Sequence, residues 1–216
     1  SAPMKIDIIS DTVCPWCFIG KRRLEEAMAQ RPDIAFEVNW RPYQLDPGVP
    51  REGMDRRDYM RAKFGDGERV KGMSESIREV GREAGIAFAF EKQERRPNTI
   101  DSHRVVHWAG SVGLQDAAVE ALFRAYFEEG RDIGDAAVLG DIAAACGMDR
   151  ELVEELLASD ADRELVLSEA GLAGRMGVQG VPAFVFEGKY AIVGAQDAAV
   201  LVRVIDKVLE KEAAAG

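Results

Sequence analysis

Strand-like segments lie near the two ends of this 216-residue chain, and helical patterns fill the part between them. Near the start, KIDIIS (5–10) is a short apolar run and AFEVNW (35–40) alternates apolar with polar residues, as β-strands do. The segment between them, 15–30, has helical spacing and carries Pro15 in its first turn, where a helix tolerates proline. The chain therefore begins with a βαβ unit.

The other end of the chain returns to β-structure. AFVFEGKYAIVG (183–194) consists of two apolar runs joined by Glu187, Gly188 and Lys189, which suits a tight hairpin because glycine accepts a positive φ. Residues 197–212 repeat apolar residues at helical spacing. Amphipathic helical stripes fill 55–177. We expect an α/β fold (βαβ…ββα) in which residues 1–54 and 178–216 form a discontinuous domain and 55–177 form an all-helical insertion.

Composition restricts the partners and the compartment. The net charge is −10 and the basic residues form no continuous stripe, so we expect no nucleic-acid partner. No apolar run of about 18 residues could span a bilayer, and no secretory apolar segment is visible, so we expect a cytoplasmic protein without a membrane partner. No glycine motif for nucleotide binding is present, and we expect no cofactor.

The segment DTVCPWCFIG (11–20) places Cys14 and Cys17 at the start of the first predicted helix. Residues three apart share one helical face, and the N-terminus of a helix favours a thiolate. A thiolate attacks disulfides, and a second thiol nearby can displace the mixed disulfide. Cys14 is therefore the predicted nucleophile and Cys17 the resolving thiol. A purely stabilising disulfide would close too short a loop to contribute much.

A zinc site is an alternative interpretation of the same cysteines. His103 and His107 in SHRVVH are four residues apart, and such a pair with C-x-x-C is a zinc ligand set. The distance in sequence from Cys17 to His103 is far longer than the about 12–15 residues of compact zinc modules. Packing beside Trp108 is the simpler interpretation of His107. For Cys146, on an apolar stripe, we expect a buried packing role.

The order strand, CPWC, helix, strand, insertion, hairpin, helix resembles a thioredoxin fold of the DsbA type. The segments CPWCFIGKRRLE, WRPYQLDP, RPNTIDSHRVVHWA and GVPAFVFEGKYAIVGAQ together resemble the FrnE-like branch of DsbA-type oxidoreductases. The resemblance implies a cis Pro182 that faces the cysteine pair and keeps metals from it, and a Val181 backbone that pairs with substrate. Pro15 and Trp16 would contact the substrate, which is a protein or small-molecule thiol or disulfide.

The same superfamily holds 2-hydroxychromene-2-carboxylate isomerases and kappa-class glutathione transferases, which normally have serine at the position of Cys14. This second resemblance places Asn98 and His103 near the mouth of the active site and makes glutathione a possible partner. A glutathione-dependent isomerase or transferase is therefore the alternative to a thiol–disulfide oxidoreductase. Two cysteines favour dithiol chemistry.

Two departures from the family pattern leave the redox direction open. DsbA has a histidine where this chain has Trp16, and tryptophan cannot carry a positive charge. The buried acid of thioredoxin has no match on the first strand, where Ile8 stands, and Asp11 is predicted to be a turn or helix-start residue. A cytosolic redox poise would make the protein a reductase or isomerase, and an oxidising compartment would make it an oxidase.

Overall fold

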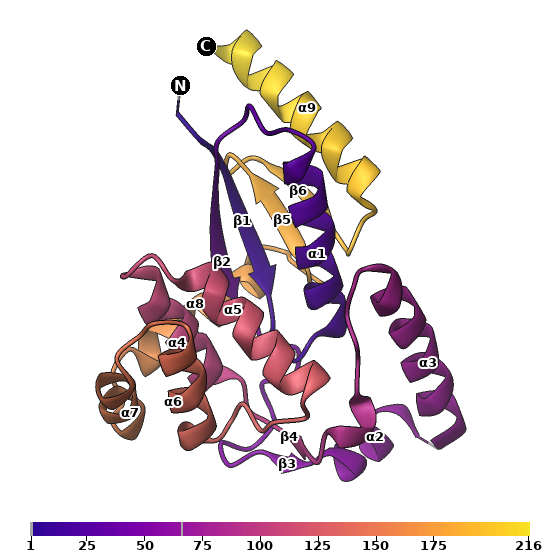
Figure 1. Cartoon of the computed structure of the whole chain (residues 1–216), viewed down its shortest axis with the longest axis vertical. Coiled ribbons are helices and arrows are strands. Elements are labelled where there is room, and N and C mark those ends of the chain that lie inside the picture. Colours follow the sequence, from indigo (N-terminus) through magenta and orange to yellow (C-terminus); the bar gives the residue numbers. More distant parts are fainter. Residues whose placement is uncertain (1, 66) are drawn as a thin grey trace.

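A mixed four-stranded sheet lies at the centre of the computed structural model, which describes residues 2–65 and 67–216. Its strand order is β2-β1-β5-β6, formed by β1 (Met4–Ser10), β2 (Phe36–Pro42), β5 (Ala183–Phe186) and β6 (Tyr190–Val193). β1 is parallel to β2 and antiparallel to β5, with Ile8 opposite Phe184. The first strand of the chain therefore lies beside its C-terminal hairpin (Figure 1).

The predicted hairpin is present. Glu187 and Gly188 both have positive φ, at 53° and 67°, between β5 and β6. Two consecutive positive φ values are what a turn that follows the twist of the strands requires, and glycine adopts the second without strain.

Two helices from the opposite ends of the chain pack against each other. They are α1 (Pro15–Ala29) and α9 (Ala198–Ala215), and Figure 1 shows α1 in front of the sheet with α9 beside it. α1 approaches Pro182 closely at Gly20, where an added Cβ would lie 2.9 Å from Pro182 Cγ. Glycine at this position therefore lets the cysteine-bearing helix lie against the loop before β5.

The segment between the two halves of the sheet is mostly helical, as predicted. Its helices are α2 (Arg56–Phe64), α3 (Gly67–Glu83), α4 (Ile100–Gly110), α5 (Gln115–Phe123), α6 (Ala136–Ala145), α7 (Arg150–Ala158) and α8 (Arg163–Arg175), with a 3-10 turn η1 (Phe90–Lys92) and a π-helical turn η2 (Arg124–Glu128). The expectation of an all-helical segment misses one antiparallel pair, β3 (Met54–Asp55) with β4 (Arg95–Arg96). Two-residue strands are too short to show alternation. None of the described helices is long and apolar enough to cross a bilayer.

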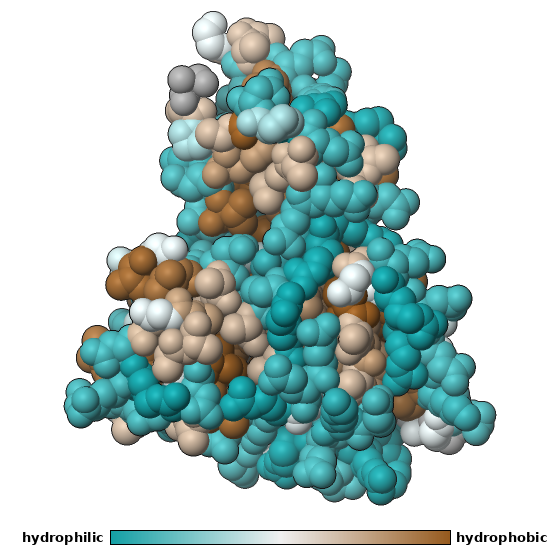
Figure 2. Space-filling view, viewed as in Figure 1, coloured by the Kyte–Doolittle hydropathy of each residue, from teal (hydrophilic) through white to brown (hydrophobic). Residues whose placement is uncertain are grey.

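These helices form two groups on either side of the start of α1. The helices α4, α5 and α8 contact β2, whereas α3 contacts α1 and α2 (Figure 1). In Figure 2 the surface is largely hydrophilic, and apolar residues are visible in the furrow between α3 and the body of the molecule. The first turn of α1 therefore lies where the sheet, α3 and the larger helical group meet.

An aromatic cluster fixes the first turn of α1 in place. Phe18, directly after Cys17, stacks on Phe123 at 5.0 Å between ring centroids and meets Phe88 edge-on at 6.1 Å. All three side chains are buried, and burying one phenylalanine contributes roughly 1.5–3 kcal/mol. The cluster ties the cysteine-bearing turn to two segments of the insertion.

Candidate active site

Cys14 is the N-cap residue of α1. Its backbone is extended, with φ −96° and ψ 112°, and its N–H donates to the Asp11 carbonyl at 3.1 Å. Pro15 follows as the first helical residue, where its missing N–H costs no hydrogen bond. The Cys14 sulfur thus lies at the positive end of the helix dipole.

Cys17 lies one turn further along α1 and is completely buried. Burial raises its pKa well above the ordinary 9.0, and the hydrogen bond with Cys14 and the charge of that neighbour raise it further. Both residues are free thiols. Cys17 therefore keeps its proton at neutral pH, which leaves Cys14 as the thiol available for attack.

The loop before β5 forms the other wall of the site. The peptide bond between Val181 and Pro182 is cis, and the Val181 carbonyl lies 3.9 Å from the Cys14 sulfur. Pro182 is buried against Gly20. Trp16 is 38% exposed and lies at the rim. The structure thus brings the cysteines, Pro15, Trp16, Val181 and Pro182 together.

Asp11 has a larger place in the site than the sequence indicates. Its carboxylate is 1% exposed and accepts hydrogen bonds from the backbone N–H groups of Thr12 and Leu45, each at 2.9 Å. The charge of Asp11 raises the pKa of Cys17, although the Asp11 backbone hydrogen bond acts in the opposite direction. The interpretation of Asp11 as a turn residue is therefore incomplete, because it is also a buried acid beside the resolving thiol.

His103 reaches the site through Asp11. Its Nε2 lies 3.1 Å from Asp11 Oδ1 and 3.0 Å from the Tyr43 carbonyl. A carbonyl can only accept, so Nε2 carries the hydrogen and donates. His103 thus orients the Asp11 carboxylate and does not line the pocket at Cys14.

Three other residues singled out in the sequence lie apart from the cysteine pair. Asn98 donates a hydrogen bond to the Val49 carbonyl at 2.9 Å and so stabilises the loop that contains Val49. His107 lines a separate small cavity. The expectation that Cys146 is buried is wrong in degree, because this residue is the C-cap of α6 and is half-buried. Within the described parts of the chain, no group of three or more His, Cys, Asp or Glu could hold a metal ion.

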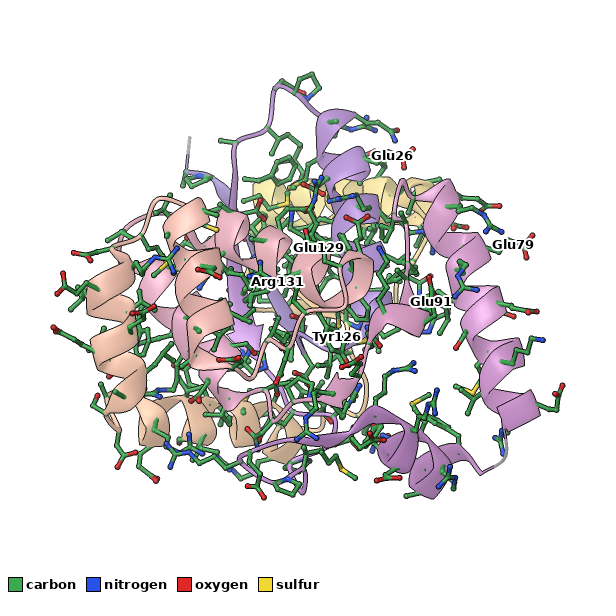
Figure 3. All side chains as sticks on the ribbon, turned by 60° about the horizontal axis from the view of Figure 1, so that its bottom comes forward. Glu26, Glu79, Glu91, Tyr126, Glu129 and Arg131 are labelled. Atoms are coloured by element: carbon green, nitrogen blue, oxygen red, sulfur yellow. The ribbon has the colours of Figure 1, made fainter. Side chains whose placement is uncertain are left out.

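A pocket of about 330 Å³ opens beside Cys14. It lies between the first turn of α1, α2, α3 and η2, and we call it the Cys14 pocket. Figure 3 shows Tyr126 of η2 in the middle of the molecule, between α3 and the larger helical group. The lining residues include several that the sequence did not single out for the site: Arg56, Tyr59, Lys63, Phe90, Arg96 and Tyr126. They come from segments far apart in the chain, so no spacing pattern links them.

The sequence matches the DSBA-like thioredoxin domain over residues 5–206. The chain belongs to this family. A crystal structure of a probable DsbA oxidoreductase from Streptomyces coelicolor is 30% identical and has a TM-score of 0.86, with 96% of this chain and 90% of that chain covered. The uncharacterised YwbO of Bacillus subtilis is 29% identical over 144 residues. That match covers 67% of this chain and 66% of YwbO, just under two thirds of the relative's length.

More distant structures share the fold. A 2-hydroxychromene-2-carboxylate isomerase is 18% identical with a TM-score of 0.74, with 98% of this chain and 99% of that chain covered. The cytosolic disulfide reductase DsbM from Pseudomonas aeruginosa, also solved with glutathione, is 20% identical with a TM-score of 0.64, covering 98% of this chain and 100% of that chain. The predicted DsbA-type thioredoxin fold is confirmed.

Proposed function

We propose that this protein is a thiol–disulfide oxidoreductase that exchanges disulfides with protein or small-molecule thiols through Cys14 and Cys17. One observation carries the proposal: the Cys14 sulfur lies at a helix N-terminus, and the fully buried Cys17, which keeps its proton, lies one turn further along the same helix. Membership of a DsbA-like family supports the redox class.

The reaction needs no group beyond the dithiol and a disulfide substrate. The Cys14 thiolate attacks one substrate sulfur, the substrate S–S bond breaks, and one substrate thiolate leaves. Cys17 then loses its proton and attacks the Cys14 sulfur, which releases the second substrate thiolate. The substrate gains two electrons, one of its two thiolates takes the proton that Cys17 released, and the cysteine pair becomes a disulfide. Oxidation of a dithiol substrate is the same sequence in reverse.

The charge of Cys14 supports a fixed order for the two steps of the exchange reaction. The negative charge of Cys14 contributes to the raised pKa of Cys17. In the mixed disulfide Cys14 carries no charge, so this contribution disappears and Cys17 loses its proton more readily. The resolving thiol is thus held back until the first step is complete.

The remaining site residues act on the substrate or on the cysteines. We assign the Val181 backbone and the surfaces of Pro15 and Trp16 to contact with the substrate, since they line the pocket at Cys14, and we assign Pro182 to holding Val181 there through the cis peptide bond. His103 acts as a positioning residue through Asp11. For Asn98, placed near the mouth by resemblance, the contacts support a role in shaping the adjacent loop.

The test is the reduction potential of the Cys14–Cys17 couple, measured in glutathione buffers by Trp16 fluorescence and mass spectrometry. A two-electron transition near about −120 to −180 mV indicates an oxidase or isomerase, and one near about −270 mV a reductase, which agrees with a cytoplasmic location. Cys17→Ser should trap a mixed disulfide and Cys14→Ser should not.

If no disulfide forms at any buffer ratio, the proposal is wrong. The glutathione-dependent isomerase or transferase then takes its place. The isomerase would turn over a 2-hydroxychromene-2-carboxylate-type substrate, and the Cys14→Ser variant would keep this activity, because that chemistry uses a serine at this position.

A further inference from the structure

The Cys14 pocket is cationic although the chain is acidic. Three of its lining residues are positively charged, Arg56, Lys63 and Arg96, and none of the described lining residues is aspartate or glutamate. The whole chain has a net charge of −10. A local excess of positive charge at the redox centre of an acidic protein favours an anionic ligand.

Two of the three cations share one carboxylate behind the pocket wall. Asp46 Oδ1 lies 2.7 Å from Lys63 Nζ, and Asp46 Oδ2 lies 2.9 Å from Arg96 Nη2. The Tyr59 hydroxyl also donates to Asp46. These contacts hold Lys63 and Arg96 in the wall.

Arg56 is different because it has no such partner. It is half-buried at the start of α2, and no acceptor among the described residues lies within hydrogen-bond or ion-pair distance of its guanidinium. The Arg56 guanidinium lies over the Phe90 ring, 6.0 Å from the ring centroid. Burial lowers the pKa of Arg56, the nearby Tyr126 acts in the opposite direction, and the neighbouring Arg96 lowers it further. A partly desolvated cation without an acceptor is costly unless a ligand supplies one.

The carboxylates around the pocket do not supply this acceptor. Glu91 of η1 pairs with Arg78 at 3.2 Å, and Glu79 extends outward from α3 (Figure 3). Asp11 is already engaged by two backbone N–H groups and His103. The donors of Arg56 therefore remain available to a bound molecule.

The rest of the lining sets the character of that molecule. It is mainly apolar, with Met60, Phe64, Met73, Ile77 and Phe90 facing the space. A volume of about 330 Å³ lies at the small end of ligand pockets and suits one ring or two fused rings with a short substituent. The wall also contains Cys14, so a sulfur of the ligand can meet the nucleophile.

We propose that the Cys14 pocket binds small organic disulfides whose carboxylate is carried on an apolar body, with the carboxylate on Arg56 and a sulfur at Cys14. This inference rests on the proposed redox function and names a substrate class for it. The ligand is itself the oxidant. Its S–S bond breaks as the Cys14–Cys17 bond forms, and the ligand leaves as two carboxylate-bearing thiolates, one of which takes the proton that Cys17 released.

The test compares two aromatic disulfides that differ in charge. Reduced protein carrying Cys146→Ser, which leaves only the active pair, is mixed in stopped flow with anionic 5,5′-dithiobis(2-nitrobenzoate) or with neutral 4,4′-dithiodipyridine. Arg56→Gln should slow the reaction with the anionic disulfide about tenfold, the loss expected for one charge-assisted hydrogen bond. It should change the reaction with the neutral disulfide less than about twofold, since no charge pair is lost there.

Arg57→Gln is the matched control. Arg57 is exposed on the same helix, does not line the pocket, and its replacement changes the net charge by the same amount. It should leave both rates unchanged, and Arg56→Lys should recover part of the loss. Equal losses with both disulfides, no loss with either, or an equal effect of Arg57→Gln would overturn the inference.

A binding measurement separates this inference from the redox proposal. The double variant Cys14→Ser/Cys17→Ser should bind 2-naphthoate in calorimetry and should not bind 2-naphthamide, and Arg56→Gln should abolish the difference. If 2-naphthoate binds through Arg56 but neither disulfide reacts, the redox function fails and the pocket assignment stands. If both disulfides react and Arg56→Gln has no effect, the redox function stands and the assignment fails.

Discussion

Two arginines in different helices are both shielded from water, but only one of them has hydrogen-bond acceptors within the chain. Arg104 of α4 is 0% exposed and donates to the Leu156 and Ser159 carbonyls at 2.9 Å each. It also donates to the Ala161 carbonyl at 2.7 Å and to Asp101 Oδ1 at 3.0 Å. Arg56, beside Cys14, meets no acceptor among the described residues. The guanidinium of Arg104 is satisfied by the fold, and that of Arg56 is left to be satisfied by a ligand.

This difference in hydrogen bonding distinguishes an arginine that stabilises the helices from one that is available to bind a ligand. Arg104 fills the space where α7 ends and α8 begins, so its cost of burial is offset by hydrogen bonds within the chain. Arg56 contributes little to the fold and keeps directional donors next to a reactive thiol. Substitutions should therefore affect stability at Arg104 and substrate preference at Arg56.

Replacing Arg104 should give the largest loss of stability. Arg104→Met leaves buried carbonyls without donors, and we expect the free energy of unfolding to fall by about 3–5 kcal/mol. Urea unfolding followed by circular dichroism measures this change. Arg163→Met is the control, because Arg163 meets the same Asp101 at 3.4 Å but is more exposed, and it should cost less than about 1 kcal/mol. A similar cost for both variants would mean that Arg104 is not the centre of this region.

The wall of the cysteine site should be the next most sensitive place. Gly20→Ala would bring a Cβ to 2.9 Å from Pro182 Cγ and 3.2 Å from Phe184 Cζ, so we expect a loss of about 1–3 kcal/mol from overpacking. Gly72→Ala in α3 meets no atom within 4 Å and should stabilise the protein by about 0.5–1 kcal/mol. Thermal unfolding of both variants checks the contrast. If Gly20→Ala has the same thermal stability as the parent protein, the segment around Pro182 can move to accept the added methyl group.

Asp11 should show a smaller effect on stability and a distinct effect on titration. Asp11→Asn offers one oxygen to two backbone donors, and we expect a loss of about 1 kcal/mol. The charge of Asp11 raises the pKa of Cys17, so its removal should move thiolate formation at Cys17 to lower pH. Absorbance at 240 nm in the Cys146→Ser background follows this step. No movement of the second titration would mean that Asp11 has only a structural role.

The same raised pKa predicts how the stability of the reduced protein depends on pH. The unfolded state loses the Cys17 proton near the ordinary pKa of 9.0, whereas the folded state holds it to higher pH. The unfolded state therefore binds fewer protons above that pH, and stability should fall as pH rises. Cys17→Ala should lose less stability than the parent between neutral and alkaline pH, as measured by denaturant midpoints. Parallel curves would contradict this assignment.

The smallest effect on stability should come from Arg56. Arg56→Met removes a cation that has no acceptor, so the free energy of unfolding should change by less than about 0.5 kcal/mol in either direction. Chemical denaturation under the conditions used for Arg104→Met gives a direct comparison. A loss as large as that of Arg104→Met would remove the distinction between the two arginines.

Local pattern predicts much of this fold. The alternation in AFEVNW, the positive φ at Gly188 and the proline after Cys14 each favour one backbone conformation with little dependence on distant residues. The family resemblance predicted that Pro182 lies near the cysteine pair, although more than 160 residues of sequence lie between them.

The remaining features depend on contacts that no local pattern records. The helix RRDYMRAKF is too charged to show an apolar stripe, so no pattern marks the bounds of α2 within the predicted helical insertion, and Arg56 lies on this helix. Full burial of Arg104 depends on three carbonyls more than 50 residues away, and the role of Asp11 depends on Leu45 and His103. A charged residue in sequence is expected to be exposed, and only tertiary structure shows where its charge is buried.

The pairing of β1 with β5 has a consequence for the order in which the protein acquires selectivity during synthesis. Cys14 and Cys17 are made first, and Val181 and Pro182, which form the opposite wall, follow more than 160 residues later. Until then, the nascent dithiol lacks the wall that Val181 and Pro182 provide. The reactive thiols are thus made well before the residues that complete the wall facing them.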